Sequence, residues 1–144
     1  MTEQNSDTAH TSDRGVEQFD LIIVGSGSGN SLIGEQWADR RVAIVDDGVF
    51  GGTCLNRGCI PTKMYAYPAS LAAASADAAR VDVQLPAGRV DFAALRDRVF
   101  GRVDAISEAG LRFRRDEQEH VTVVAERARF LSLIHISEPT RRRG

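Results

Sequence analysis

Residues 19–46 read FDLIIVGSGSGNSLIGEQWADRRVAIVD, and this stretch decides the fold class. The apolar run 19–24 leads into a glycine-rich stretch, a helical pattern spans Ser31 to Asp39, and a second apolar run covers 41–46. Short, continuous apolar runs are typical of strands buried in a parallel sheet. The order of strand, helix and strand is that of a βαβ unit. The sequence therefore predicts an α/β fold with a doubly wound sheet.

The glycine-rich stretch and the acid behind it have the spacing of a dinucleotide-binding motif. Asp46 lies 21 positions after the first glycine and is expected to accept hydrogen bonds from ribose hydroxyls. The glycines allow a tight turn and a close approach of the backbone to a pyrophosphate, which the helix N-terminus would bind. Asn30 stands in place of the third glycine of the motif. The predicted ligand contacts in this stretch are Gly25, Gly27, Ser28 and Gly29.

Residues 51–63, GGTCLNRGCIPTK, contain the only two cysteines, Cys54 and Cys59, and the only lysine, Lys63. Two thiols this close can form a redox-active pair. A structural disulfide is the alternative, but a loop this short would contribute only about 2 kcal/mol. Two inert buried thiols are a second alternative. A zinc site is disfavoured, because the chain has no other cysteine and its three histidines are scattered.

The local sequence around these cysteines predicts how they are held. Gly52 and its neighbour allow a tight turn, and Thr53 is a good N-cap, so a helix is expected to begin at Cys54. The positive end of that helix would stabilise a thiolate and lower the pKa of Cys54. Pro61 is expected to distort the first turns and to bring the two sulfurs together.

The segment 51–63 resembles the active-site signature of the flavin-dependent disulfide reductases, and the resemblance covers about residues 19–70. It implies an incomplete FAD-binding, Rossmann-like domain, with FAD and NADPH as cofactors and the NADPH-binding domain absent from this chain. It further implies that Cys54 attacks the substrate disulfide and that Cys59 lies beside the flavin. Lys63 would lie near the flavin, and Gly52 and Thr53 would be further cofactor contacts. Arg57 departs from the small apolar residue that is usual in the family.

The same resemblance implies reduction of a low-molecular-weight disulfide by a protein that is a homodimer at full length. One branch of the family shares Gly29-Asn30-Ser31, residues 99–104 and Arg129-Phe130 with this chain. Two alternatives remain open: a relative of the lipoamide dehydrogenases or mercuric reductases, and a non-enzymatic, truncated flavin- or thiol-binding remnant. The chain by itself is expected to be inactive and poorly soluble.

The composition of the chain disfavours several other classes of protein. The chain has 144 residues, 42% of them hydrophobic, and a formal net charge of −2, which does not favour a nucleic-acid partner. No stretch approaches the ~20 apolar residues of a membrane span. Residues 1–18 are polar and lack the apolar core of a secretory signal, so we expect a disordered tail and a cytoplasmic protein.

Residues 19–130 are expected to form the partial FAD-binding domain. Helices are expected over 64–79 and from an N-cap at Asp91 to about Ile106 with a solvated charged face, a charged connection over 112–119, and a strand over 121–124. Shorter strands are possible at 81–83 and from 128. Residues 131–144 resemble translated DNA of a sequencing-library adapter and are expected to be non-native.

Overall fold

The computed structural model describes residues 16–130, so most of the expected tail 1–18 and all of the segment 131–144 lie outside the described residues. The elements follow one another as β1 (Leu21–Val24), η1 (Ser28–Leu32), η2 (Glu35–Trp37), β2 (Val42–Val45), α1 (Gly52–Arg57), α2 (Cys59–Ala79), α3 (Phe92–Asp116) and β3 (Val121–Val124).

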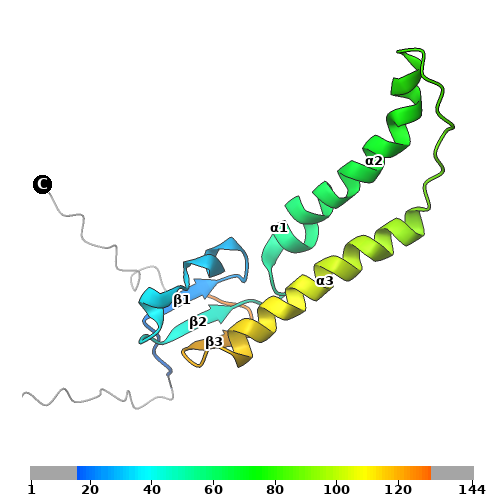
Figure 1. Cartoon of the computed structure of the whole chain (residues 1–144). Helices are drawn as coiled ribbons and strands as arrows, with labels where there is room; N and C mark the ends of the chain where they lie inside the picture. The colour runs from blue at the N-terminus through cyan, green and yellow to red at the C-terminus, as the bar shows by residue number, and fades with distance from the viewer. Residues whose placement is uncertain (1–15, 131–144) are drawn as a thin grey trace, which may run out of the picture.

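The three strands form one parallel sheet in the order β1-β2-β3, with β2 in the centre (Figure 1). Leu21 is paired with Val42, and Val42 with Val121, so the strands run in step along their whole length. This order is that of one half of a doubly wound sheet. The predicted α/β class is confirmed.

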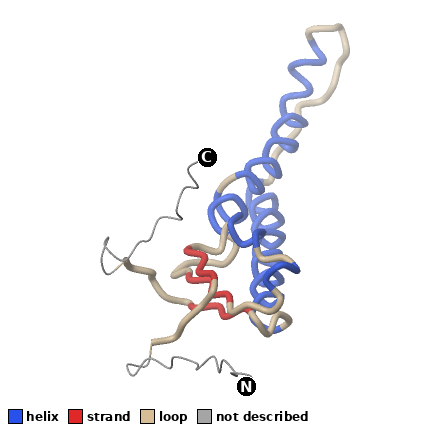
Figure 2. Tube along the Cα trace, turned by 90° about the vertical axis from the view of Figure 1, so that its left-hand side faces the viewer, coloured by secondary structure: helices blue, strands red, loops and turns tan. Residues whose placement is uncertain are grey.

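One face of the sheet forms the core. The buried side chains come from all three strands, from the segment after β1 and from the loop after β2, and they are Ile23, Ile33, Val42, Ile44, Phe50 and Val121. The helices lie beside the sheet on one side (Figure 2). Ile22 and Val24 point the other way and are 56% and 62% exposed. The prediction that the first strand is buried is therefore correct for only one of its faces.

The helix expected from Ser31 to Asp39 is absent, and two short 3-10 turns, η1 and η2, take its place. Gly34 separates them in an extended conformation, and the buried Ile33 before it is extended as well. Arg114 of α3 donates hydrogen bonds to the carbonyl oxygens of Asn30 (2.7 Å) and Ile33 (3.3 Å). Those carbonyls are thus bonded to another helix, and packing of Ile33 into the core outweighs local helix propensity.

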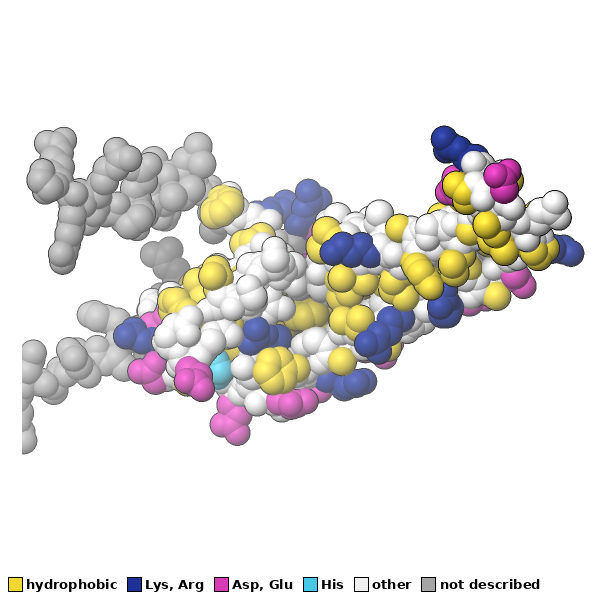
Figure 3. All heavy atoms as spheres, turned by 45° about the horizontal axis from the view of Figure 1, so that its top comes forward, with side chains coloured by type: hydrophobic (Ala, Val, Ile, Leu, Met, Phe, Trp, Pro, Cys, Tyr) yellow, Lys and Arg dark blue, Asp and Glu magenta, His cyan; other side chains and the backbone are white. Residues whose placement is uncertain are grey.

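Helices α2 and α3 form a long antiparallel hairpin that extends away from the sheet (Figure 1). Asp91 is the N-cap of α3, as expected, and accepts a hydrogen bond of 3.0 Å from the amide of Ala94. Hydrophobic side chains gather on the surface of this hairpin (Figure 3). Several of them are exposed, namely Tyr67, Leu71, Val90, Phe92 and Phe100. Neither described long helix is apolar enough to cross a membrane.

Three expectations for the second half of the chain are wrong. Helix α3 continues to Asp116, so most of the expected connection 112–119 is helical. Arg114, expected in that charged connection, lies on the buried side of this helix, since its guanidinium bonds carbonyl groups of the first βα segment. The segments 81–83 and 128–130 are not strands, whereas β3 forms where it was expected.

Candidate functional site

A cleft of about 500 Å³ lies at the carboxyl ends of β1 and β2. Clefts at this edge of an open parallel sheet are where ligands usually bind. Its walls come from the end of β1, the glycine-rich stretch, the loop after β2 and helix α1. The lining residues include Gly25, Gly27, Gly29, Asp46, Gly52, Thr53, Asn56 and Arg57. The cleft therefore unites six of the eight cofactor contacts predicted from the sequence.

Ser28 and Lys63 do not line the cleft. Ser28 is exposed in η1, and Lys63 is exposed in α2, four residues after Cys59 and on the same side of the helix. The cysteines are also outside the lining, although Thr53, Asn56 and Arg57 place one face of α1, the helix of Cys54, in the cleft wall. The glycine-lined cleft and the exposed thiols thus lie on different sides of α1, which bears Cys54 itself.

The glycines bring two backbones together at the start of α1. A Cβ atom on Gly52 would lie only 2.6 Å from the Cα atom of Gly27, and Gly52 has a φ of +68°. Gly51 also has a positive φ, of +107°, and it is the N-cap of α1. The expected N-cap, Thr53, is therefore wrong: the helix begins at Gly52, and Thr53 lies inside the first turn. Side chains are excluded here because the cysteine helix packs directly on the glycine-rich stretch.

Asp46 follows β2 and binds donors of this chain. Its Oδ2 atom accepts hydrogen bonds from the amide (2.7 Å) and the hydroxyl (2.6 Å) of Ser26, and its Oδ1 atom accepts one from the amide of Gly48 (2.8 Å). The Ser26 hydroxyl, and to a smaller extent the two amides, hold the pKa of Asp46 below its ordinary value of 3.8, against partial burial. The carboxylate is therefore ionised at neutral pH, and Oδ1 keeps room for a further donor.

Asn56 fastens α1 to the loop after β2. Its Nδ2 atom donates to the carbonyl oxygens of Val49 and Phe50, both at 3.1 Å, while its Oδ1 atom is buried without a partner among the described residues. Ser107 of α3 donates to the same Phe50 carbonyl at 2.5 Å. These contacts were not predicted from the sequence. Asn56 and Arg57 follow Thr53 by three and four residues. In a helix this spacing places them on the same face as Thr53, and this is the signal that could have identified them.

The helix carrying the cysteines is broken between them. Helix α1 ends at Arg57, and α2 begins at Cys59, with Gly58 at the junction. Pro61 has no N–H to bond the carbonyl of Arg57, so the break lies where the proline was expected to act. A Cβ atom on Gly58 would lie 3.0 Å from the carbonyl oxygen of Thr53. Glycine therefore lets α2 start close against the first turn of α1.

Both thiols are free and exposed. The Cys59 thiol raises the pKa of Cys54, because a hydrogen bond between the two thiols favours the protonated form. The Cys59 amide and the charge of Lys63 act in the opposite direction but do not outweigh it. The expectation of a lowered pKa at Cys54 is therefore wrong for the dithiol, since the neighbouring thiol, with partial desolvation, raises the pKa more than the Cys59 amide and Lys63 lower it.

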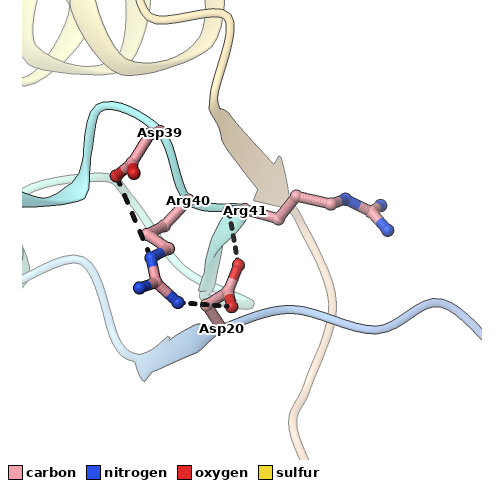
Figure 4. Close-up of polar contacts among 4 residues, drawn as sticks. All are labelled: Asp20, Asp39, Arg40 and Arg41. Atoms are coloured by element: carbon pink, nitrogen blue, oxygen red, sulfur yellow. Dashed lines mark hydrogen bonds and ion pairs between the residues drawn. The ribbon is translucent and has the colours of Figure 1, made fainter. Parts of the chain in front are cut away.

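The opposite end of the sheet has its own carboxylate, Asp20 (Figure 4). It accepts a hydrogen bond of 2.9 Å from the amide of Arg41, and its Oδ1 atom lies 3.5 Å from the guanidinium of Arg40. The Arg41 amide, followed by Arg40, holds the pKa of Asp20 below its ordinary value of 3.8. This corner is exposed and is not lined by glycines, so it joins β1 to β2 without forming a cleft.

The chain is similar in sequence to several known proteins. No family model matches the chain. Over 100 residues it is 46% identical to the mycothione reductase of Mycobacterium tuberculosis, which covers 69% of this chain and 22% of the reductase. Over 81 residues it is 35% identical to the mercuric reductase of Lysinibacillus sphaericus, covering 55% of this chain and 15% of that enzyme. The chain thus spans about a fifth of the length of these relatives.

A solved structure supports the fold. The Cu(II) complex of the HOCl-induced flavoprotein disulfide reductase RclA from Escherichia coli superposes with a TM-score of 0.58 at 23% identity. The match covers 76% of this chain and 22% of that structure. In sequence the chain is a relative of the flavoprotein disulfide reductases, and in fold it is a segment of their Rossmann-like architecture.

Proposed function

We propose that this chain is the flavin- and dithiol-bearing segment of an FAD-dependent disulfide reductase that uses NADPH to reduce mycothione. One observation carries the proposal: six predicted cofactor contacts line one cleft, and α1 in its wall bears Cys54, with Cys59 at the start of the adjoining α2. Identity of 46% to a mycothione reductase, against 35% to a mercuric reductase, supports the choice of substrate. A homodimeric whole protein belongs to the same proposal.

The residues of the cleft fit a dinucleotide. Gly25, Gly27 and Gly29 present backbone without side chains, and the amides of Gly27 and Gly29 donate to no acceptor within the described residues. These amides suit a pyrophosphate, and the ionised Asp46 suits a ribose hydroxyl. Gly52 and Thr53 complete the wall. In the proposal the FAD, when bound, supplies the two electrons that return the cysteine pair to its dithiol form.

The reaction of the dithiol with substrate follows from its exposure. The Cys54 thiolate attacks one sulfur of the substrate disulfide, forming a mixed disulfide and expelling one thiolate. Cys59 then attacks the Cys54 sulfur, which releases the second thiolate and leaves a Cys54–Cys59 disulfide. Two electrons have passed to the substrate, and solvent protonates both products. Lys63 favours the first step because its charge stabilises the Cys54 thiolate.

The two cysteine roles are tested without flavin. The reduced chain is mixed with a small symmetrical disulfide, and the adducts are followed by mass spectrometry. The wild type should release two thiols per chain and end as an intramolecular disulfide. Cys59→Ser should stop at a mixed disulfide on Cys54, because no second thiol remains to resolve it. Cys54→Ser should react more slowly.

Accumulation of an adduct on Cys59 in the wild type, or complete release of both thiols by Cys59→Ser, would contradict the assigned roles. Ser70→Ala is a matched control, since it removes an exposed hydroxyl of α2 that bonds only the carbonyl of Tyr67. By the same proposal residues 1–144 alone have no NADPH-driven turnover, which NADPH oxidation by the purified chain measures.

A further inference from the structure

The hydroxyl of Ser26 joins three segments of the chain. It donates to the Oδ2 atom of Asp46 at 2.6 Å and accepts a hydrogen bond of 2.9 Å from the amide of Gly51. Asp46 follows β2, and Gly51 is the N-cap of α1. Ser26 itself lies in the glycine-rich stretch after β1. One side chain therefore connects the acidic wall of the cleft to the N-cap of α1, the helix that bears Cys54.

Burial makes this arrangement specific. Ser26 is 1% exposed, so bulk water cannot replace either partner of its hydroxyl. A buried hydroxyl has one proton to donate, and here the proton goes to the carboxylate, which leaves a lone pair for the Gly51 amide. Gly25 and Gly27 on either side have no side chain that could serve instead. A serine between two glycines thus provides a connection that the glycines cannot.

The Gly51 amide needs an acceptor. Gly51 and Gly52 both have positive φ, so the chain turns sharply before α1, and the first amides of a helix have no partner within it. No other acceptor for the Gly51 amide exists among the described residues. Cys54 lies three residues further along the same helix. Whatever holds Gly51 therefore also sets where the helix bearing Cys54 begins.

We propose that Ser26 is a positioning residue that couples Asp46 to the start of α1, and through it to Cys54. The carboxylate fixes the orientation of the hydroxyl, and the oriented hydroxyl fixes the Gly51 amide. The meaning of the coupling for a reductase depends on the function proposed above, because there Asp46 contacts the cofactor and Cys54 contacts the substrate. The hydrogen-bond network itself can be tested without either ligand.

The test measures solvent exchange of single backbone amides by NMR on the full 144-residue chain. Gly51 reports the bond to Ser26, and Gly48 reports the separate bond to Oδ1 of Asp46. Ser26→Ala should speed the exchange of Gly51 about tenfold, the effect of losing one hydrogen bond, and leave Gly48 unchanged. Asp46→Ala should speed both amides, although Asp46 does not itself bond Gly51.

The double variant Ser26→Ala/Asp46→Ala decides the coupling. If Asp46 acts on Gly51 through Ser26, the exchange of Gly51 in the double variant equals that in Ser26→Ala, while Gly48 exchanges as in Asp46→Ala. Additive effects on Gly51, or no effect of Asp46→Ala on Gly51, would overturn the proposal. Ser26→Thr, which keeps the hydroxyl, should restore slow exchange of Gly51.

The coupling can be judged even if one variant does not fold, and independently of the proposed function. If Ser26→Ala does not fold by circular dichroism, the response of Gly51 to Asp46→Ala alone still supports or overturns the coupling. Flavin is absent from the experiment, so a failure to bind FAD would count against the proposed function and leave the network standing. An intact flavin site with uncoupled Gly51 would count against the network only.

Discussion

Asp20 and Asp46 perform the same structural task at opposite ends of one sheet. Asp20 precedes β1 and accepts from the amide of Arg41 before β2, while Asp46 follows β2 and accepts from the amide of Ser26 after β1. Each carboxylate thus ties the first two strands together, and each has a lowered pKa. Their surroundings differ.

At Asp20 the additional partner is Arg40, an exposed side chain, so the contact ends at the surface. At Asp46 the additional partner is the buried hydroxyl of Ser26, which continues to Gly51 and the cysteine helix. Two similar strand connections therefore differ in what they are connected to. At the Asp46 end, two glycine backbones also pack against each other, so that a Cβ atom on Gly52 would lie 2.6 Å from the Cα atom of Gly27. No glycine of the described residues makes such a contact at the Asp20 end.

The largest expected effect comes from adding a side chain where Gly52 packs against Gly27. Gly52→Ala places a Cβ atom 2.6 Å from backbone that cannot rotate away, in a left-handed conformation. We expect a loss of about 2–5 kcal/mol in the free energy of unfolding, measured by urea denaturation. Gly101→Ala is the matched control, because no atom lies within 4 Å of its Cβ position in α3. It should stabilise the chain by about 0.5–1 kcal/mol, and equal effects of both variants would refute the close packing.

The next largest effect is expected on the affinity for FAD. Asp46→Ala should weaken the affinity for FAD about ten- to a hundredfold, the usual range of a lost hydrogen bond to a charged group. Asp47→Ala, one residue further and exposed, should leave the affinity unchanged. Fluorescence titration measures both. If the two variants bind FAD equally well, the choice of Asp46 as the ribose contact is wrong.

A smaller effect concerns pH. The folded-state pKa of both carboxyl groups lies below 3.8, so each contributes stability above that pH and loses it as the pH falls through the folded-state value. Asp46→Asn should cost about 1 kcal/mol at neutral pH, after allowance for solvent screening, and less in acid. Asp20→Asn should follow the same direction.

Added salt should raise the pKa of Asp20 more than that of Asp46. Screening weakens the attraction of Arg40 for Asp20 but hardly affects the neutral donors of Asp46. NMR titration of both carboxyl groups at low and high salt measures this. A pKa of Asp46 that rises with salt as much as that of Asp20 would show that charges, not Ser26, lower it.

The sequence predicted most of the elements because their signals are local. Apolar runs gave β1, β2 and β3, and Asp91 gave the start of α3. The helix over 31–39 was wrong because Ile33 packs into the core and Arg114, more than eighty residues later, binds the carbonyls of this segment. A contact between residues so far apart in the sequence does not change the hydrophobic pattern of residues 31–39, so that pattern could not reveal it.

The candidate site divides in the same way. The order of residues alone determined the α/β class, the glycine spacing, the position of Asp46 after a strand and the short separation of Cys54 from Cys59, since each depends on neighbours along the chain. Only the tertiary structure decided that Gly51 caps the helix, that the second thiol raises the pKa of Cys54, and that Ser26 joins Asp46 to Gly51. The first two depend on how the backbone turns at Gly51 and breaks at Gly58, and the third on which groups meet at the sheet edge; packing and hydrogen bonds fix all three only once the chain has folded.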